Sequence, residues 1–177
     1  MKKVLIICGS PRKGGNSDLL AEQFGRGAAE SGNQVETVHL RDLKINYCIG
    51  CLACQRTGSC FQQDDANNLL GKMMEADVVC FSCPVYYYSV SGQMKVFIDR
   101  MNPLYGHMAN KDFYYMVTAQ DESHSQLDRA IDALQGFVDC FDDMHVRARI
   151  YGDGAEKKGE IQNTPAFMAA YKAGKEL

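Results

Sequence analysis

"KVLIICGSPRKGGNSDLL", residues 3–20, carries the clearest fold signal in the chain. Its first part, Lys3–Cys8, is a short branched apolar run of the length expected for a buried strand. Gly9 to Asn16 is rich in the residues of loops, and Ser17–Glu30 has the periodicity of a helix. A buried strand that passes through a polar loop into a helix begins a β-α-β unit, so this stretch indicates a parallel sheet.

The same alternation continues along the chain. Further strands are predicted at 34–40, 77–82, 112–119 and 145–151, and further helices at 66–76, 90–101, 123–141 and 164–175. Pro84 is expected to end the third strand, and Asp64 or Asp65 to cap the helix predicted at 66–76. We therefore expect an α/β fold with a doubly wound, five-stranded parallel sheet and helices on both faces. Residues 1–177 are expected to form a single domain, with 41–65 as an aperiodic, cysteine-bearing insertion.

Composition excludes several classes of protein. The net charge is -3, and no basic stripe is present, so no nucleic-acid partner is expected. No stretch approaches the roughly 20 apolar residues of a membrane span, and the run Val4–Cys8 is shorter than the roughly 7–15 residues of a secretory core. We expect a cytoplasmic protein without membrane contact. Thiols stay reduced in that compartment, where clustered cysteines bind metals or catalyse more often than they form disulfides.

The loop after the first strand has the features of an anion site. Gly14 and Gly15 allow the backbone to approach a ligand, and the next helix presents its positive end to the same space. Polar donors come from Ser10, Arg12, Gly15 (through its backbone), Asn16 and Ser17. The loop lacks the Lys-Ser/Thr of ATPase loops and the G-x-G-x-x-G of dinucleotide folds. It predicts a phosphate site, with a capped turn that binds no ligand as the alternative.

The loop after the third predicted strand is aromatic. It lies within "SCPVYYYSVSGQMKVFIDR", residues 82–100, and offers a surface against which a flat conjugated ligand could lie. The candidate contacts are Pro84, Val85, Tyr86, Tyr87, Tyr88 and Ser89, with Thr118 and Ala119 from the end of the fourth predicted strand. Ser89 or Ser91 is expected to cap the next helix. The alternative is that the tyrosines only cover an interface or the sheet edge.

"GSPRKGGNS" (residues 9–17), together with "ADVVCFSCPVYYYSVSGQMKVFIDR" (residues 76–100), resembles the flavodoxin-like NADPH-dependent FMN reductase family. The stretch from Tyr151 to Leu177 is similar to that family's C-terminal end. The resemblance implies FMN with its phosphate in the loop from Ser10 to Ser17 and its ring against Pro84 to Ser89. It also implies NAD(P)H as co-substrate and a homodimer or homotetramer, because family members commonly share the flavin cleft between subunits.

Residues 48–60, "CIGCLACQRTGSC", place four thiols in a C-x2-C-x2-C-x5-C pattern. These candidate metal ligands are Cys48, Cys51, Cys54 and Cys60. A long aperiodic loop is uncommon in a compact domain unless something else orders it, and the first three thiols have the ferredoxin spacing. Zinc, a redox dithiol and a loop without metal remain alternatives. The spacing resembles that of the iron-sulfur flavoproteins, a branch that binds a [4Fe-4S] cluster beside FMN.

The other four cysteines, Cys8, Cys80, Cys83 and Cys140, are expected to be small buried hydrophobic residues.

The predicted function is an FMN-dependent oxidoreductase that takes electrons from NAD(P)H and passes them to a small-molecule or protein acceptor. One alternative is an electron carrier in which a [4Fe-4S] cluster relays electrons from ferredoxin to FMN. Another is a zinc-bearing interaction module without redox activity. No side chain is predicted as a catalytic acid or base, because the flavin itself carries out hydride chemistry.

Overall fold

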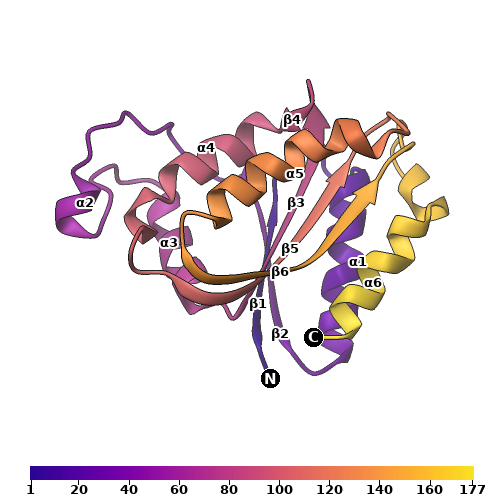
Figure 1. Cartoon of the computed structure of the whole chain (residues 1–177), viewed down its shortest axis with the longest axis horizontal. Coiled ribbons are helices and arrows are strands. Elements are labelled where there is room, and N and C mark those ends of the chain that lie inside the picture. Colours follow the sequence, from indigo (N-terminus) through magenta and orange to yellow (C-terminus); the bar gives the residue numbers. More distant parts are fainter.

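A twisted parallel sheet forms the centre of the protein (Figure 1). The structure is a computed structural model that describes residues 1–177. The parallel strands follow the order β2-β1-β3-β5-β6. They are β1 (Lys3–Cys8), β2 (Gln34–His39), β3 (Val78–Tyr86), β5 (Ala109–Thr118) and β6 (Asp142–Gly152), while the short β4 (Ser89–Val90) pairs antiparallel with β3. This confirms the predicted five-stranded, doubly wound sheet.

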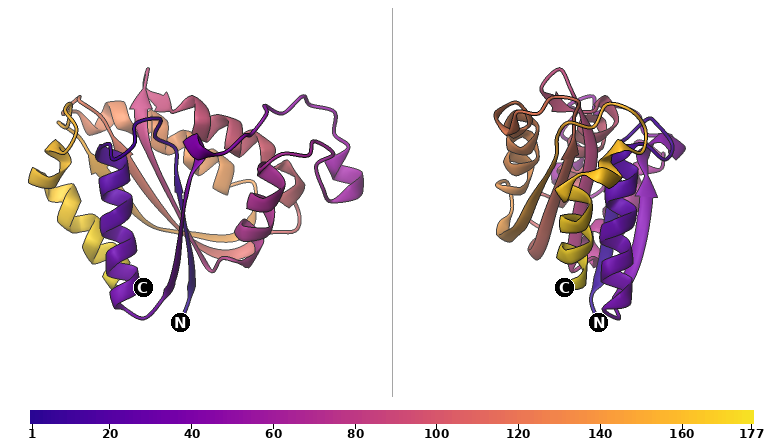
Figure 2. Two further views of the ribbon diagram at one scale, coloured as in Figure 1. Left: turned by 180° about the vertical axis from the view of Figure 1, so that it is seen from behind. Right: turned by 90° about the vertical axis from the view of Figure 1, so that its right-hand side faces the viewer.

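Helices cover both faces of the sheet (Figure 2). They are α1 (Asn16–Glu30), α2 (Cys54–Thr57), α3 (Ala66–Glu75), α4 (Gly92–Arg100), α5 (His124–Val138) and α6 (Pro165–Lys175), with single 3-10 turns η1 (Leu40–Asp42), η2 (Asn102–Leu104) and η3 (Glu160–Asn163). Val4 and Ile6 pack against α1 and α6, whereas Leu5 and Ile7 pack in the core shared with α3, α4 and α5. Burial on both faces explains why β1 is apolar at every position from Val4 to Cys8 rather than at alternate ones. None of the helices combines the length and apolar character needed to cross a membrane.

Strand β3 is longer than the sequence predicts, because Pro84 does not end it. The carbonyl of Ser82 accepts a hydrogen bond from the Gly9 N–H, so Ser82 and, two residues on, Pro84 turn their backbone groups towards β1. Strand β1 has already ended at Cys8, so no strand lies beside Pro84 on that side. The N–H group that proline lacks is therefore not needed for pairing. The strand therefore continues to Tyr86 and folds back through β4.

The order of the strands reverses at β1, which lies between β2 and β3. Loops that leave neighbouring strands in opposite directions open a crevice at the carboxyl edge of such a sheet. The 9–17 loop, the β3–β4 hairpin and the loop after β5 all meet at this edge. The predicted ligand-binding segments are thus brought together by the topology.

Two glycines allow α1 and α6 to cross in direct backbone contact, as Figure 1 shows for the two helices. A Cβ atom at Gly27 would overlap the Tyr171 carbonyl and lie 2.8 Å from the Lys175 nitrogen. A Cβ atom at Gly174 would overlap the Phe24 carbonyl in the same way. Neither overlap can be relieved by a side-chain rotation, because the opposing atoms are backbone.

Gly27→Ala is therefore expected to destabilise the protein by about 1–3 kcal/mol, through overpacking of the α1–α6 contact. On helix propensity alone the same change would stabilise by about 1 kcal/mol. Gly71→Ala is the matched control, because Gly71 lies in α3 with no atom near its missing Cβ, and it is expected to stabilise. Urea unfolding of both variants measures the difference. Stabilisation by both would show that α1 and α6 do not lie in backbone contact.

Candidate functional site

A cavity of about 290 Å³ opens at the carboxyl edge of the sheet. Its walls are Ser10, Arg12, Gly15, Asn16, Ser17, Pro84, Val85, Tyr86, Thr118, Ala119, Gln120, Ala155 and Glu156. Every predicted cofactor-binding residue except Tyr87, Tyr88 and Ser89 lies in this wall. Sequence reasoning missed Gln120, Ala155 and Glu156, which follow β5 and β6 in loops without a recognisable motif. We call this space the phosphate-side cavity.

Free hydrogen-bond donors gather where the 9–17 loop enters α1. The first helical hydrogen bond runs from the Leu19 N–H to the Gly15 carbonyl, so the N–H groups of residues 16–18 have no backbone acceptor. The Ser17 hydroxyl also has no partner within the protein, and Arg12 is exposed beside it. Gly14 adopts a positive φ of 65°, which only glycine takes without strain. This end of α1 suits an anion.

Two of the predicted donors instead hold the loop in shape. The Ser10 hydroxyl accepts from the Arg12 N–H at 3.1 Å. The Asn16 amide donates to the carbonyls of Ala155 and Lys157, each at 3.0 Å, and its oxygen accepts from the Gly159 N–H at 2.9 Å. Asn16 therefore ties the loop after β6 to the start of α1. Its side chain forms part of the cavity wall but has no spare donor for a ligand, so only its backbone N–H is free.

A buried ion pair lies beneath the same loop. Asp18 is 1% exposed and receives Arg41 Nη1 at 2.8 Å and the Gly14 N–H at 2.8 Å. The same guanidinium nitrogen donates to the Ser10 carbonyl at 3.2 Å. His39 Nδ1 lies 3.7 Å from the other Asp18 oxygen. Arg41 thus supports the loop from below, a role that the sequence did not suggest.

A second cavity, of about 450 Å³, adjoins the first and shares Val85, Ala119 and Gln120 with it. Tyr87 and Tyr88 form part of its wall and make the two-residue turn of the β3–β4 hairpin, with φ of 50° and 61°. Such a turn normally takes Asn or Gly, so the tyrosines hold strained backbone at the rim. We call this space the ring-side cavity.

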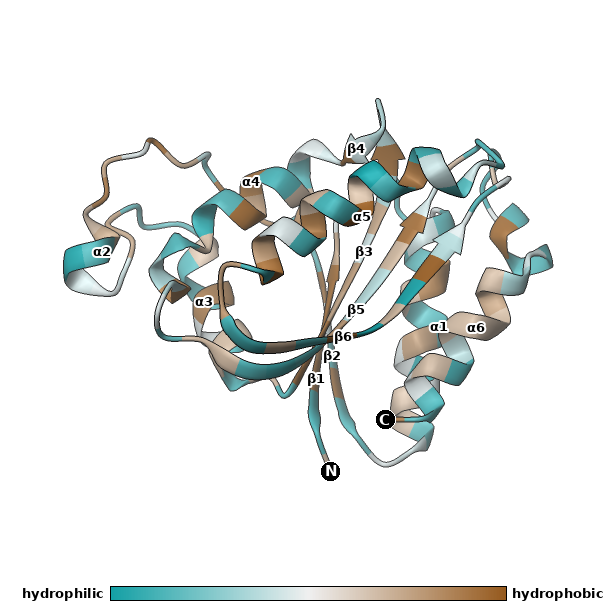
Figure 3. Cartoon of the chain, in the orientation of Figure 1, coloured by the Kyte–Doolittle hydropathy of each residue, from teal (hydrophilic) through white to brown (hydrophobic).

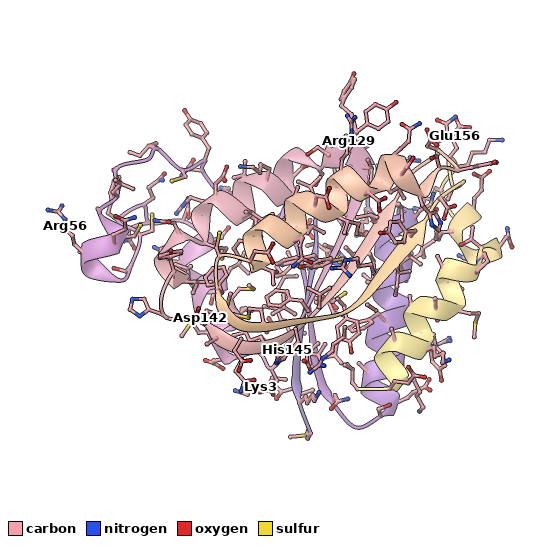
Figure 4. The ribbon with its side chains drawn as sticks, viewed as in Figure 1. Lys3, Arg56, Arg129, Asp142, His145 and Glu156 are labelled. Carbon is pink, nitrogen blue, oxygen red and sulfur yellow. The ribbon has the colours of Figure 1, made fainter.

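Two further residues complete the hairpin. Ser89 pairs with Tyr86 across it and contributes to neither cavity wall. Ser91, not Ser89, caps α4, because its side chain accepts from the Met94 N–H. Arg129 of α5 lies over the Tyr88 ring, 5.5 Å from its centroid, and Figure 4 shows it beside the hairpin. The hairpin is therefore held against α5.

The segment from Leu43 to Gln63, the cysteine arm, extends away from the body of the protein (Figure 1). It contains one short helix, α2, and otherwise little regular structure, as its lack of periodicity predicts. The arm is apolar for much of its length (Figure 3), and Tyr47, Ile49, Leu52 and Phe61 are exposed. Cys48, Cys51, Cys54 and Cys60 all line one cavity of about 300 Å³. The predicted ligand set is thus gathered around one space.

The separation of the four sulfurs bears on which metal fits. A zinc ion at about 2.3 Å from each sulfur would hold them about 3.8 Å apart. No three of the four sulfurs lie within 4.8 Å of one another. The thiols are therefore not closed around a single ion, and an all-thiol donor set suits an iron-sulfur cluster as well as zinc.

The arm is attached to the body by a second buried ion pair. Arg100, at the end of α4, is 1% exposed and binds both oxygens of Asp64, at 2.6 and 2.9 Å. Burial alone would raise the pKa of Asp64, but hydrogen bonds from Arg100 and from the N–H groups of Asn46 and Ala66 outweigh it and lower that pKa. Asp65 occupies the N-cap position of α3, but its side chain makes no capping hydrogen bond. Asp64, one residue earlier, accepts from the Ala66 N–H of the first turn at 3.1 Å.

The remaining cysteines divide into two kinds. Cys8, Cys80 and Cys83 are buried, and burial raises the pKa of the Cys83 thiol to about 12. Cys140 is exposed, so its predicted burial is wrong: α5 ends at Val138, and Cys140 lies on the turn beyond it. Its thiol donates to the Gly136 carbonyl at 3.3 Å.

The cysteine arm and the two edge cavities lie far apart in space within one subunit. Arg56 of α2 and Glu156 of the phosphate-side cavity are at opposite ends of the long axis (Figure 4). One chain therefore does not bring its own four thiols to its own cavities.

Comparison with known proteins agrees with this architecture. An iron-sulfur flavoprotein from Archaeoglobus fulgidus is 47% identical over 105 residues, 59% of this chain and 47% of that protein. One from Methanocaldococcus jannaschii is 43% identical over 102 residues, 58% of this chain and 53% of that protein. The chain thus matches about half the length of these curated relatives. An azoreductase structure from Bacillus anthracis superposes over 100% of both chains with a TM-score of 0.76 at 17% identity, which shows a shared fold.

The model of one protein family, described as NADPH-dependent FMN reductase, matches residues 2–149. This stretch includes the 9–17 loop, the cysteine arm, the tyrosine hairpin and the loop after β5. The match therefore confirms the resemblance on which the sequence interpretation relied. This chain belongs to the NADPH-dependent FMN reductase family.

Proposed function

We propose that this protein is an FMN-dependent oxidoreductase that takes electrons from NAD(P)H and delivers them to a small-molecule or protein acceptor. The observation that carries the proposal is the pair of adjoining cavities at the carboxyl edge of the sheet. One has the open N–H groups of α1 at its end, and the other has an aromatic wall. A ligand with a phosphate at one end and a flat ring at the other matches both, and FMN is such a ligand.

The residues present fit FMN. The N–H groups of residues 16–18, the Ser17 hydroxyl and Arg12 would hold the phosphate, and Asp18 is already neutralised by Arg41. Val85, Tyr87 and Tyr88 would exclude water from the ring. When bound, the flavin supplies hydride and single-electron chemistry, so the chain itself needs only to bind, orient and shield.

We also propose that the cysteine arm holds a [4Fe-4S] cluster and that it exchanges single electrons with ferredoxin. The four thiols around one cavity support the cluster, and relatives named iron-sulfur flavoproteins are consistent with a cluster in this chain. The separation of the arm from the cavities supports a homodimer or homotetramer, in which another subunit brings the two together. The requirement for reduced thiols supports a cytoplasmic location.

One anaerobic preparation tests the redox function. Protein reconstituted with iron, sulfide and FMN is expected to bind FMN and to lose its flavin absorbance within seconds of adding NADPH or NADH. Bound iron and flavin are counted in the same sample. Protein that binds FMN but is reduced by neither nucleotide would favour the ferredoxin-linked carrier. Protein that rejects FMN would overturn both redox functions and favour the zinc-bearing module.

The phosphate end of the site is tested by Arg12→Gln, which is expected to weaken FMN binding about tenfold through loss of a charge-assisted hydrogen bond. Riboflavin, which lacks the phosphate, should bind both proteins equally. Lys13→Gln is the matched control, because Lys13 is the adjacent exposed cation but does not line the cavity. Quenching of flavin fluorescence measures the affinities of all three proteins for both flavins. An equal loss of riboflavin affinity would contradict a phosphate contact at Arg12.

A further inference from the structure

Two side chains of the body donate hydrogen bonds to cysteine sulfurs of the arm. Asn102 Nδ2 donates to Cys54 Sγ at 2.9 Å, and Arg100 Nη2 donates to Cys60 Sγ at 3.4 Å. Both donors come from the junction of α4 and η2. The two thiols that they contact are only half-exposed.

The other two thiols have no such partner. Cys48 and Cys51 are exposed, and the single hydrogen bond to either is a local one, from the Gly50 N–H to Cys48 Sγ at 3.5 Å. The four candidate ligands are therefore not equivalent. One pair is hydrogen-bonded from the protein interior, and the other pair faces solvent.

Arg100 can hold its position without help from the sulfur. Its guanidinium binds Asp64 through both nitrogens and donates to the Asn46 carbonyl at 2.7 Å. It thereby joins the two ends of the arm, Asn46 before the cysteines and Asp64 after them. The Asp64 carboxylate offsets the charge of Arg100. Arg100 therefore acts on the Cys60 sulfur through its hydrogen bond more than through net charge.

Hydrogen bonds to ligand sulfurs are one of the main factors that set the potential of an iron-sulfur cluster. A donor withdraws electron density from the thiolate and stabilises the reduced state, which carries one more negative charge. We propose that Asn102 and Arg100 raise the reduction potential of the cluster in the cysteine arm by donating to Cys54 and Cys60. This inference rests on the proposed cluster, and it makes these two residues positioning residues for the one-electron step between the cluster and its redox partner.

The test is a potentiometric titration of anaerobic, iron-loaded protein, with dithionite as reductant and the electron paramagnetic resonance signal of the reduced cluster as readout. Asn102→Leu keeps the size of the side chain and removes its donor. It is expected to shift the ratio of reduced to oxidised cluster about tenfold at fixed potential, equivalent to about 59 mV lower for one electron. Asn102→Gln keeps an amide and should recover part of the shift. Arg100→Lys, which keeps the charge but loses the fork, should lower the potential less.

Asn67→Leu is the matched control. Asn67 also holds the arm, but its amide donates to the carbonyls of Cys60 and Gln62 rather than to sulfur. The cluster of the Asn67→Leu variant should have the same reduction potential as that of the wild type. This comparison separates loss of a sulfur hydrogen bond from loosening of the arm. A shift as large as that of Asn102→Leu would overturn the proposal.

The remaining outcomes separate this inference from the function on which it rests. Wild-type protein without bound iron overturns both the cluster and the inference. Full iron in every variant with unchanged potentials overturns the inference alone. A folded Asn102→Leu protein that holds no iron would make Asn102 a determinant of cluster binding, and the inference as stated would fail.

Discussion

Cys54→Ala protein is expected to lose its iron, from about four atoms per chain to almost none, while its FMN content stays unchanged. The reason is that Cys54 is one of four thiols around a single cavity, and no other cysteine lies there to replace it. The flavin should remain, because the phosphate-side cavity lies at the other end of the molecule (Figure 4). Iron and flavin counts on anaerobic protein, with absorbance near 400 nm, measure the effect.

Cys140→Ala is the control for this experiment, since Cys140 is an accessible thiol that lies on the turn after α5 and not at the cysteine cavity. It should keep its full iron content. Loss of the cluster should also leave the arm without its main source of order. Trypsin is then expected to cut after Arg56 faster in Cys54→Ala than in Cys140→Ala. Retained iron in Cys54→Ala would contradict the proposed ligand set.

Local chemistry accounts for most of what the sequence predicted correctly. Thr164 and Pro165 mark the start of α6 because proline suits the first helical turn, and the structure begins the helix there. The apolar run of β1 and the polar loop after it are likewise readable from adjacent residues. These signals were sufficient to predict the sheet, its helices and most of the wall of the phosphate-side cavity.

Features that depend on distant residues were not predicted. Asp18 and Arg41 are 23 positions apart, and Asp64 and Arg100 are 36 apart, so no periodicity or motif joins either pair. The hairpin of Tyr87 and Tyr88 was missed for another reason, because sequence rules assign such turns to glycine and asparagine. Pro84 was wrongly predicted to end β3. The N–H group that proline lacks is needed only where a neighbouring strand offers an acceptor, and β1 has already ended beside Pro84.

Arg41→Met is expected to destabilise the protein by about 3–5 kcal/mol, because it leaves a buried carboxylate without its cation. Asp18 would retain only the Gly14 N–H as a close partner, and the Ser10 carbonyl would lose its donor. FMN binding should weaken as well, since an uncompensated negative charge would then lie beneath the phosphate-side cavity. Urea unfolding of the flavin-free protein and FMN titration measure the two effects separately.

The double variant Asp18→Asn/Arg41→Met tests the cause. Removing both charges should recover most of the lost stability, because neither ion is then buried alone. Arg26→Met is the matched single control, because the contacts of Arg26 lie at the surface: an ion pair with Glu30 at 3.9 Å and a position over the Tyr171 ring, 4.8 Å from its centroid. Its loss should cost about 1 kcal/mol or less. If Arg41→Met costs no more than Arg26→Met, Arg41 does not support the loop. The opposite result makes Arg41, in the η1 turn that follows β2, a structural support of the phosphate-side cavity, because its guanidinium holds both Asp18 and the Ser10 carbonyl.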